Sequence, residues 1–155
     1  YPLQQVGVED KALVKAYSDD FFAEIVYKKK TMPHAVEALE YLSSKYNLYI
    51  LSNGFRELQE QKMRSAGVDK YFKKVVLSED IGVHKPFPEI FYFAMSATQS
   101  ELHTSLMIGD NWENDIAGAK DAGLGQVFYN VKKTTKFSFQ PTGIMEDWNE
   151  IGKIL

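Results

Sequence analysis

The sequence predicts an α/β domain in which a mostly parallel, doubly wound sheet is covered by helices on both faces. Short apolar runs that suit buried strands alternate along the chain with longer segments of helical periodicity. This alternation is typical of parallel strands that are joined by helical crossovers. The 155 residues, 45% of them hydrophobic, suffice for one substantial core and give no sign of a second.

The first predicted element is a helix over residues 10–28. Apolar side chains recur there every three or four residues, at Leu13, Val14, Tyr17, Phe21 and Ile25. Such a stripe should pack against another part of the protein. A charged tract follows, with a candidate helix cap at Thr31 and a proline at Pro33, which places a boundary near residue 30.

Beyond that boundary, helices and strands alternate as far as Asn130. Predicted helices cover 36–46, 55–67, 88–98 and 113–123, and predicted strands cover 48–52, 74–78, 106–110 and 126–130. The pattern then weakens, and residues 131–143 are expected to form a surface connection. The last residues, 147–155, are expected to form a short closing helix.

Composition excludes several classes of partner and site. The formal charge of -3 comes from 21 acidic and 18 basic residues spread along the chain, so neither nucleic acid nor a membrane is expected as a partner. Without cysteine, the chain offers no disulfide, no thiolate metal ligand and no cysteine nucleophile. It shows no signal-peptide pattern and no apolar run of membrane-spanning length. A cytoplasmic location is therefore the default expectation.

Polar residues follow the first predicted strand at the sheet edge where open parallel sheets bind ligands. Ser52 ends this strand, and Asn53 and Gly54 lead into the next helix. A hydroxyl group beside the free N–H groups of a helix start, reached through a flexible glycine, suits a phosphate group. An ordinary turn with a helix cap explains the same three residues equally well.

Lys85 lies in the loop that follows the second predicted strand. Pro86 and Pro88 stiffen this loop, so the ammonium group would be held near the same sheet edge. There it could neutralise a phosphoryl oxygen or the charge that develops during phosphoryl transfer. The alternative is a solvated loop lysine, which is the usual state of this residue type.

An acidic pair follows the third predicted strand. Asp110 ends the strand, and Asp115 lies five residues later in the first turn of a helix. Two carboxylates that face one pocket suit Mg²⁺, which binds one or two protein carboxylates and retains several waters. Alternatively, Asp115 only complements the helix dipole and Asp110 caps a turn.

The sequences "YILSNG", "GVHKPFPEIF" and "MIGDNWENDI" together resemble the haloacid dehalogenase-like hydrolase superfamily. The second motif of that family is a strand ending in Ser or Thr, the third is a lysine and the fourth is an acidic pair, in this order. The resemblance extends from about Thr31 to Asn130 and implies a Rossmann-like core. Its details look most like the noncanonical pyrimidine nucleotidases that carry a helical cap.

The resemblance implies a magnesium-dependent phosphatase that acts on a small phosphorylated metabolite. In such enzymes, an aspartate attacks phosphorus to give an aspartyl-phosphate, and a second aspartate serves as general acid and base. By resemblance, Ser52, Asn53 and Gly54 would bind phosphate, Lys85 would steady the nucleophile and the phosphoryl group, Asp110 would ligate Mg²⁺, and Asp115 would support the metal site.

The nucleophile motif of the family, a strand ending in Asp-x-Asp, has no match in this chain. The aspartates ahead of residue 48 are Asp10, Asp19 and Asp20, and none of them follows an apolar strand. Family topology places the missing strand at the centre of the sheet, between the strands that end at Ser52 and Asp110. Its loss would expose two strand edges.

An N-terminal fragment or a second chain is therefore expected to complete the sheet. Residues 1–30 would then be the remnant of a helical cap domain, and residues 31–155 would form the α/β core. The full-length parent is expected to be a phosphatase, with nucleotides among its candidate substrates. The alternative is a non-catalytic phosphate-binding or metal-binding module, or a subunit whose partner supplies the nucleophile. A phospho-receiver domain does not fit, because its Lys-Pro step follows its acidic residues.

Overall fold

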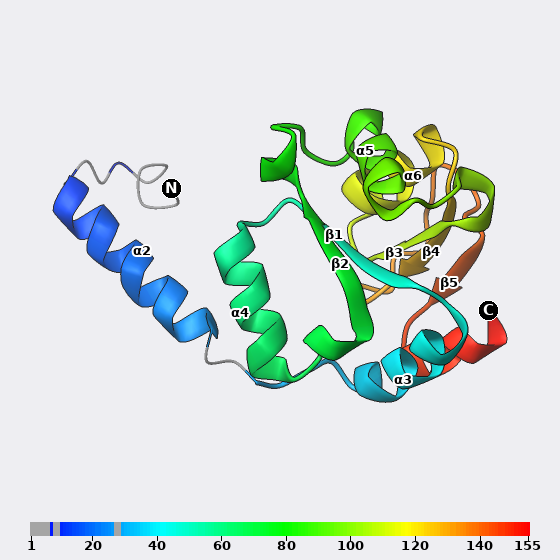
Figure 1. Cartoon of the computed structure of the whole chain (residues 1–155), viewed down its shortest axis with the longest axis horizontal. Helices are drawn as coiled ribbons and strands as arrows, with labels where there is room; N and C mark the ends of the chain where they lie inside the picture. Colours follow the sequence, from blue (N-terminus) through cyan, green and yellow to red (C-terminus); the bar gives the residue numbers. More distant parts are fainter. Residues whose placement is uncertain (1–6, 8–9, 27–28) are drawn as a thin grey trace.

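The computed structural model describes residue 7, residues 10–26 and residues 29–155. Its helices are α2 (Lys11–Val26), α3 (Ala35–Lys45), α4 (Arg56–Ala66), α5 (Pro88–Thr98) and α6 (Gly118–Asp121). Its strands are β1 (Leu48–Ser52), β2 (Phe72–Leu77), β3 (Leu106–Gly109), β4 (Gly125–Tyr129) and β5 (Gly143–Met145). Helices and strands alternate from α3 to β4, which confirms the predicted α/β class (Figure 1).

The described strands form two parallel sheets. In one sheet, β1 pairs with β2. In the other, β4 lies between β3 and β5. Among the described residues, no strand pairs with the second edge of β1 or with the second edge of β3. The sheet is thus divided as the sequence predicts, between the strand that ends at Ser52 and the strand that leads to Asp110.

Apolar clusters cover both faces of the divided sheet. One cluster joins α3, through Leu42, to β4, β5 and the C-terminal residues. The other joins α5, through Phe91, to α6. β3 contributes to both, with Leu106 and Ile108 against the first cluster and Met107 against the second. Successive side chains of a strand point to opposite faces, so this alternation confirms that the fold is doubly wound.

Two helix ends follow directly from local sequence. α5 begins at Pro88, where the missing N–H would have had no partner within the helix. α4 ends at Gly67, which adopts a positive φ of 68° and donates its N–H to the Arg64 carbonyl. Both ends lie where the sequence predicts them.

The residue that precedes α3 differs from the predicted cap, although the helix itself lies within one residue of its predicted range. The helix begins at Ala35 and not after Thr31, so the cap predicted at Thr31 is wrong. The chain enters the helix through His34, a left-handed residue with a φ of 57°. Its ring Nδ1 lies 2.7 Å from Oδ1 of Asp147, near the other end of the chain. The residue before this helix is therefore in contact with a distant part of the chain.

The C-terminal region contains a strand that the sequence pattern does not predict. β5 pairs with β4, and Gly143 is needed there because a Cβ atom would overlap the side chain of Ile154. The predicted closing helix is present as the 3-10 helix Trp148–Lys153. Asp147 caps it by accepting the N–H of Asn149 at 2.9 Å.

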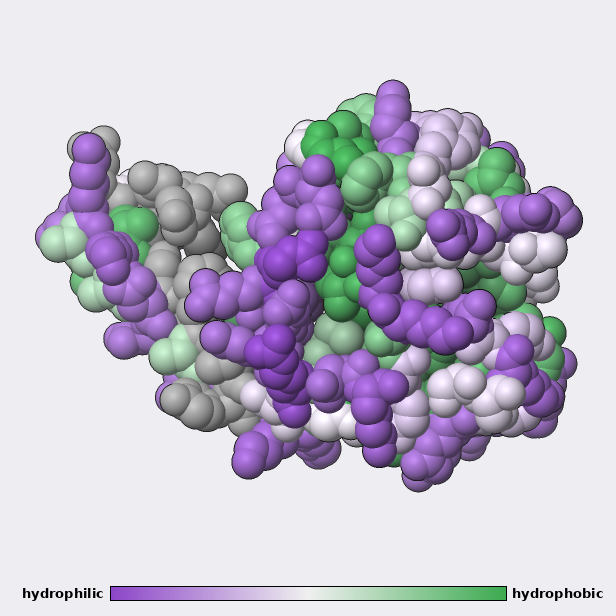
Figure 2. Space-filling model, in the orientation of Figure 1, coloured by the Kyte–Doolittle hydropathy of each residue, from purple (hydrophilic) through white to green (hydrophobic). Residues whose placement is uncertain are grey.

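α2 stands at one end of the molecule and contacts α4 (Figure 1). Val14 is buried, but Leu13, Tyr17 and Phe21 are 54%, 48% and 49% exposed, so the predicted apolar stripe is only partly covered. Hydrophobic residues are accordingly visible on this end of the surface (Figure 2). None of the described helices has the length and apolar character needed to cross a membrane. The assignment of residues 1–30 to a cap domain stays a prediction.

Candidate active site

The predicted site residues lie at the carboxyl ends of β1, β2 and β3, and the structure brings several of them into contact through Lys85. The Lys85 ammonium donates to the carbonyl oxygen of Leu51 at 2.9 Å and to Oδ1 of Asp115 at 2.6 Å. Lys85 thus joins the end of β1 to the turn after β3. Among the described residues, these two strands do not pair with each other and belong to different sheets.

Lys85 and Asp115 form a buried ion pair. Their side chains are 10% and 8% exposed. Water screens such a pair poorly, so each charge depends on the other for compensation. The solvated loop lysine is therefore not what the structure shows. An ammonium group has three N–H donors, and with two of them bound to protein one remains for a ligand.

Asn53 holds the backbone of Lys85. Its side-chain oxygen accepts the Lys85 N–H at 2.8 Å, and its amide nitrogen donates to the Lys85 carbonyl at 3.1 Å. This pair of bonds fixes the loop after β2 against the end of β1. Sequence reasoning assigns Asn53 to phosphate, whereas in the structure its amide is engaged in positioning the lysine loop.

Ser52 ends β1 with its hydroxyl oxygen between two donors. It accepts the N–H of Gly54 at 3.1 Å and the side-chain amide of Gln59 at 2.9 Å. The bond from Gly54 closes the Ser-Asn-Gly turn that the sequence alone suggests. Gln59 is a site residue that sequence reasoning missed. Its only signal is its place one turn inside the helix that follows Ser-Asn-Gly.

Asp115 lies in the π-helical turn Trp112–Ala117. Its Oδ2 accepts the Asn111 N–H at 3.1 Å, while Oδ1 faces Lys85. Gly109 leaves room for this side chain, since a Cβ atom there would overlap it. Asn111 caps the turn by accepting the N–H of Asn114 at 2.9 Å, a role that sequence reasoning did not assign.

Asp110 is exposed, and no hydrogen bond or ion pair joins its carboxylate to another described residue. It is close enough to Tyr129 to contribute to the raised pKa of that phenol, after burial and Asp147. A free carboxylate at this edge fits a divalent cation, which needs only one or two such ligands. The described residues contain no cluster of three or more acidic, histidine or cysteine side chains that would bind a metal without help.

An aromatic cluster flanks the acidic turn. The Trp112 ring lies 5.2 Å from Phe128, 4.9 Å from Phe137 and 4.8 Å from Phe139, measured between ring centroids. Its indole N–H donates to the Ser138 hydroxyl at 3.3 Å. This packing orders the chain between Asp110 and Asp115, and it identifies Trp112 as a packing residue.

The aspartates ahead of β1 have structural roles or lie free on α2. Asp10 caps α2 by accepting the N–H groups of Ala12 and Leu13 at 2.9 and 3.2 Å. Asp19 pairs with Lys15 on the helix surface. None of the described aspartates therefore occupies the position of the nucleophile at the end of a strand before β1.

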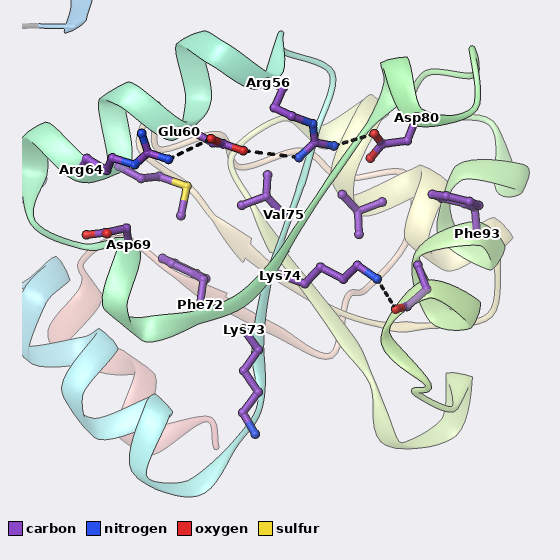
Figure 3. A pocket seen from close by; sticks show the side chains of 13 residues that line it. Arg56, Glu60, Arg64, Asp69, Phe72, Lys73, Lys74, Val75, Asp80 and Phe93 are labelled. Atoms are coloured by element: carbon purple, nitrogen blue, oxygen red, sulfur yellow. Dashed lines mark hydrogen bonds and ion pairs between the residues drawn. The ribbon is translucent and has the colours of Figure 1, made fainter.

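A cavity of about 570 Å³ lies away from these residues. It follows the open edge of β2 between α4 and α5 (Figure 3). Arg56 pairs there with Asp80 and Glu60, and Glu60 also pairs with Arg64. Most of its charges thus satisfy one another, and the cavity contains none of the predicted site residues.

Comparison with known proteins agrees with this geometry. A family model described as haloacid dehalogenase-like hydrolase matches residues 3–123. The chain is 35% identical over 118 residues to the pyrimidine 5'-nucleotidase YjjG of Escherichia coli, with 76% of this chain and 51% of that protein covered. It is 32% identical over 106 residues to a glyceraldehyde 3-phosphate phosphatase of Methanothermobacter thermautotrophicus, with 68% and 47% covered.

The structure also superimposes on a solved relative. A crystal structure of the putative HAD-hydrolase YfnB from Bacillus subtilis, bound to magnesium, matches with a TM-score of 0.85 at 27% identity. The match covers 98% of this chain and 66% of that one. The chain spans about half the length of the curated relatives it matches. From its motifs, its divided doubly wound sheet and the match over residues 3–123, this chain belongs to the haloacid dehalogenase-like hydrolases.

Proposed function

We propose that this chain forms the phosphate-binding and metal-binding part of a magnesium-dependent phosphomonoesterase. The observation that carries the proposal is the buried Lys85–Asp115 pair, which holds an ammonium group against the Leu51 carbonyl, one residue before Ser52, at the carboxyl end of β1. The remaining N–H of Lys85 would bind a phosphoryl oxygen, and the Ser52 hydroxyl would bind another. Asn53 would keep the lysine loop in place.

Site charge supports the magnesium requirement. Lys85 is one cation, while Asp110 and Asp115 are two carboxylates, so these three residues would repel a phosphate dianion on balance. Asp110 would hold Mg²⁺ directly, and Asp115 would support the site through the Asn111 backbone and Lys85. A bound Mg²⁺ would neutralise charge on the transferring phosphoryl group.

We further propose that the attacking aspartate belongs to a strand that fills the space between β1 and β3. A preceding segment of the protein or a second chain would supply it. Its carboxylate would attack phosphorus and displace the alcohol, which would take a proton from the second acidic group. Water would then cleave the aspartyl-phosphate to inorganic phosphate and regenerate the carboxylate. The edges of β1 and β3 that have no partner strand among the described residues support this placement.

For the substrate we propose a small phosphate ester, and nucleoside monophosphates are the first candidates. The pyrimidine 5'-nucleotidase relative supports this choice, and the triose phosphatase relative makes glyceraldehyde 3-phosphate the natural comparison. The first experiment determines the mass of the denatured protein made from its native gene. It also measures phosphate release from a nucleoside monophosphate and from glyceraldehyde 3-phosphate. A mass well above 17.7 kDa together with turnover that EDTA abolishes is expected.

The variant Asp110→Asn tests the assignment of Asp110 as a Mg²⁺ ligand. Mg²⁺ affinity measured by calorimetry should fall at least about tenfold, because a free carboxylate is lost, while the melting temperature stays the same. Asp69→Asn is the matched control, since Asp69 is also exposed and lines the separate cavity, which contains none of the predicted site residues. Unchanged Mg²⁺ binding in Asp110→Asn would refute the assignment.

A non-catalytic binding module remains the second candidate, and the lack of a strand-end aspartate before β1 among the described residues favours it. The two candidates differ in one result. If the native protein has a mass of 17.7 kDa, binds phosphate with Mg²⁺ and releases no phosphate from any ester, the module is correct and the phosphatase is not.

A further inference from the structure

Gln59 contacts the predicted phosphate site without being one of its ligands. It lies on α4, one turn after the helix begins, and its amide nitrogen donates to the Ser52 hydroxyl oxygen at 2.9 Å. The Gly54 N–H donates to the same oxygen at 3.1 Å. Two N–H groups, one from the backbone and one from a side chain, therefore meet at one hydroxyl oxygen.

A serine hydroxyl has two acceptor lone pairs and one hydrogen to donate. Because Gly54 and Gln59 occupy both acceptor positions, the hydrogen is directed away from them. No described residue accepts that hydrogen from Ser52. The hydroxyl is thus set as a donor before any ligand arrives, and a donor is what a phosphoryl oxygen requires.

The surroundings hold Gln59 in this position. A Cβ atom on residue 54 would overlap the Gln59 amide, so Gly54 provides the space through which the side chain reaches Ser52. The start of α4 is fixed as well, since the Arg56 N–H donates to Glu79 at 3.1 Å and the Arg56 guanidinium pairs with Asp80. Arg56 thereby ties the helix that carries Gln59 to the turn after β2.

We propose that Gln59 is a positioning residue, which orients the Ser52 hydroxyl as a hydrogen-bond donor to the phosphoryl group. This inference rests on the proposed phosphatase function and identifies a further residue of that site. Gln59 itself does not touch the substrate. Without it, one lone pair of Ser52 is free, and the hydroxyl can rotate toward other partners.

The experiment uses the full-length protein and compares Gln59→Leu with Gln61→Leu. Gln61 lies on the same helix, is exposed and has no partner among the described residues. Binding of inorganic phosphate in the presence of Mg²⁺ is measured by calorimetry, together with kcat and KM for a phosphate ester. Gln59→Leu should weaken phosphate binding about tenfold, equal to about 1.4 kcal/mol, while Gln61→Leu should match the parent.

A double-mutant cycle with Ser52→Ala separates positioning from a general structural effect. If Gln59 acts through the hydroxyl, Gln59→Leu has no further effect on phosphate binding once Ser52 is alanine. An equal loss in both backgrounds overturns the inference. Should Gln59→Leu fold poorly, Gln59→Met replaces it, because this uncharged side chain of similar length offers no N–H to Ser52.

The outcomes distinguish this inference from the function on which it rests. A parent protein that neither binds phosphate nor turns over an ester refutes both. A parent that does both, with Ser52→Ala impaired and Gln59→Leu equal to Gln61→Leu, leaves the phosphatase in place and refutes the role of Gln59 alone.

Discussion

Hydrogen-bond capacity decides which side chains of the site are free for a ligand. Asn53 and Asp115 are engaged at both polar atoms, Lys85 retains one N–H, and Asp110 has no partner among the described residues. Sequence position indicates which residue types reach this edge of the sheet. It does not indicate which of them bind one another, because those contacts depend on side-chain geometry across separate loops. For the same reason, the sequence pattern does not indicate that Gln59 contacts Ser52.

The buried ion pair gives a prediction for stability. Lys85→Met should lower the free energy of unfolding by about 3–5 kcal/mol, because it leaves the Asp115 carboxylate buried without its cation. Adding Asp115→Asn should recover part of this loss. Urea denaturation measures both variants, with Lys73→Met as control, since Lys73 is exposed and has no partner among the described residues. Equal losses in Lys85→Met and Lys73→Met would contradict the role of the pair.

At the scale of elements, residues that restrict the backbone locally are sufficient to predict where a helix ends, whereas short or weakly patterned elements cannot be predicted from the sequence. Pro88 and Gly67 mark helix ends that the structure reproduces, because each residue restricts the backbone by itself. The strand β5 has only three residues, too few for a periodic pattern. His34, just before α3, contacts Asp147, and no local sequence pattern indicates a contact over such a separation.

The turn after β2 gives a prediction for pH dependence. The Leu77 N–H and then the Arg56 guanidinium stabilise the Asp80 carboxylate and lower its pKa below the usual 3.8. The ionised form is therefore favoured in the folded state, and its contribution is fully present above about pH 5. As pH falls through 3.8 toward the lower folded pKa, this contribution should be lost.

Asp80→Asn tests that turn. The variant should be less stable at pH 7 and should lose less stability than the parent between pH 5 and pH 3, because one carboxylate no longer titrates. Thermal unfolding across this pH range provides the measurement. Asp20→Asn, an exposed change on α2, serves as the control and should follow the parent. Parallel curves for Asp80→Asn and the parent would contradict the assignment.

At the scale of the whole molecule, two sheets are held together by side chains. The apolar clusters on both faces include residues of β1 and of β3, and Lys85 joins their carboxyl ends. The order of the motifs was enough to predict where the sheet is divided, since each motif belongs to a particular strand. The cap assignment of residues 1–30 stays a prediction, because the motifs all lie beyond it.

Hydrogen exchange should reveal the divided sheet. In the 155-residue chain, amides of β4 should exchange most slowly, since β4 has a partner on each side. Alternate amides of β1 and β3 should exchange quickly, because they face an edge without a described partner. In the protein made from its native gene, those amides should become protected. Fast exchange there in both samples would contradict a completing strand between them.

The two tryptophans lie in separate surroundings, so intrinsic tryptophan fluorescence can report on one region of the protein at a time. Trp112 lies between Asp110 and Asp115 within its phenylalanine cluster, whereas Trp148 packs 5.1 Å from Tyr129 near the C-terminus. Replacing Trp148 with phenylalanine would leave one fluorophore. Its emission would then follow any rearrangement of the acidic turn as a cation or phosphate is titrated, without a dye or a coupled assay.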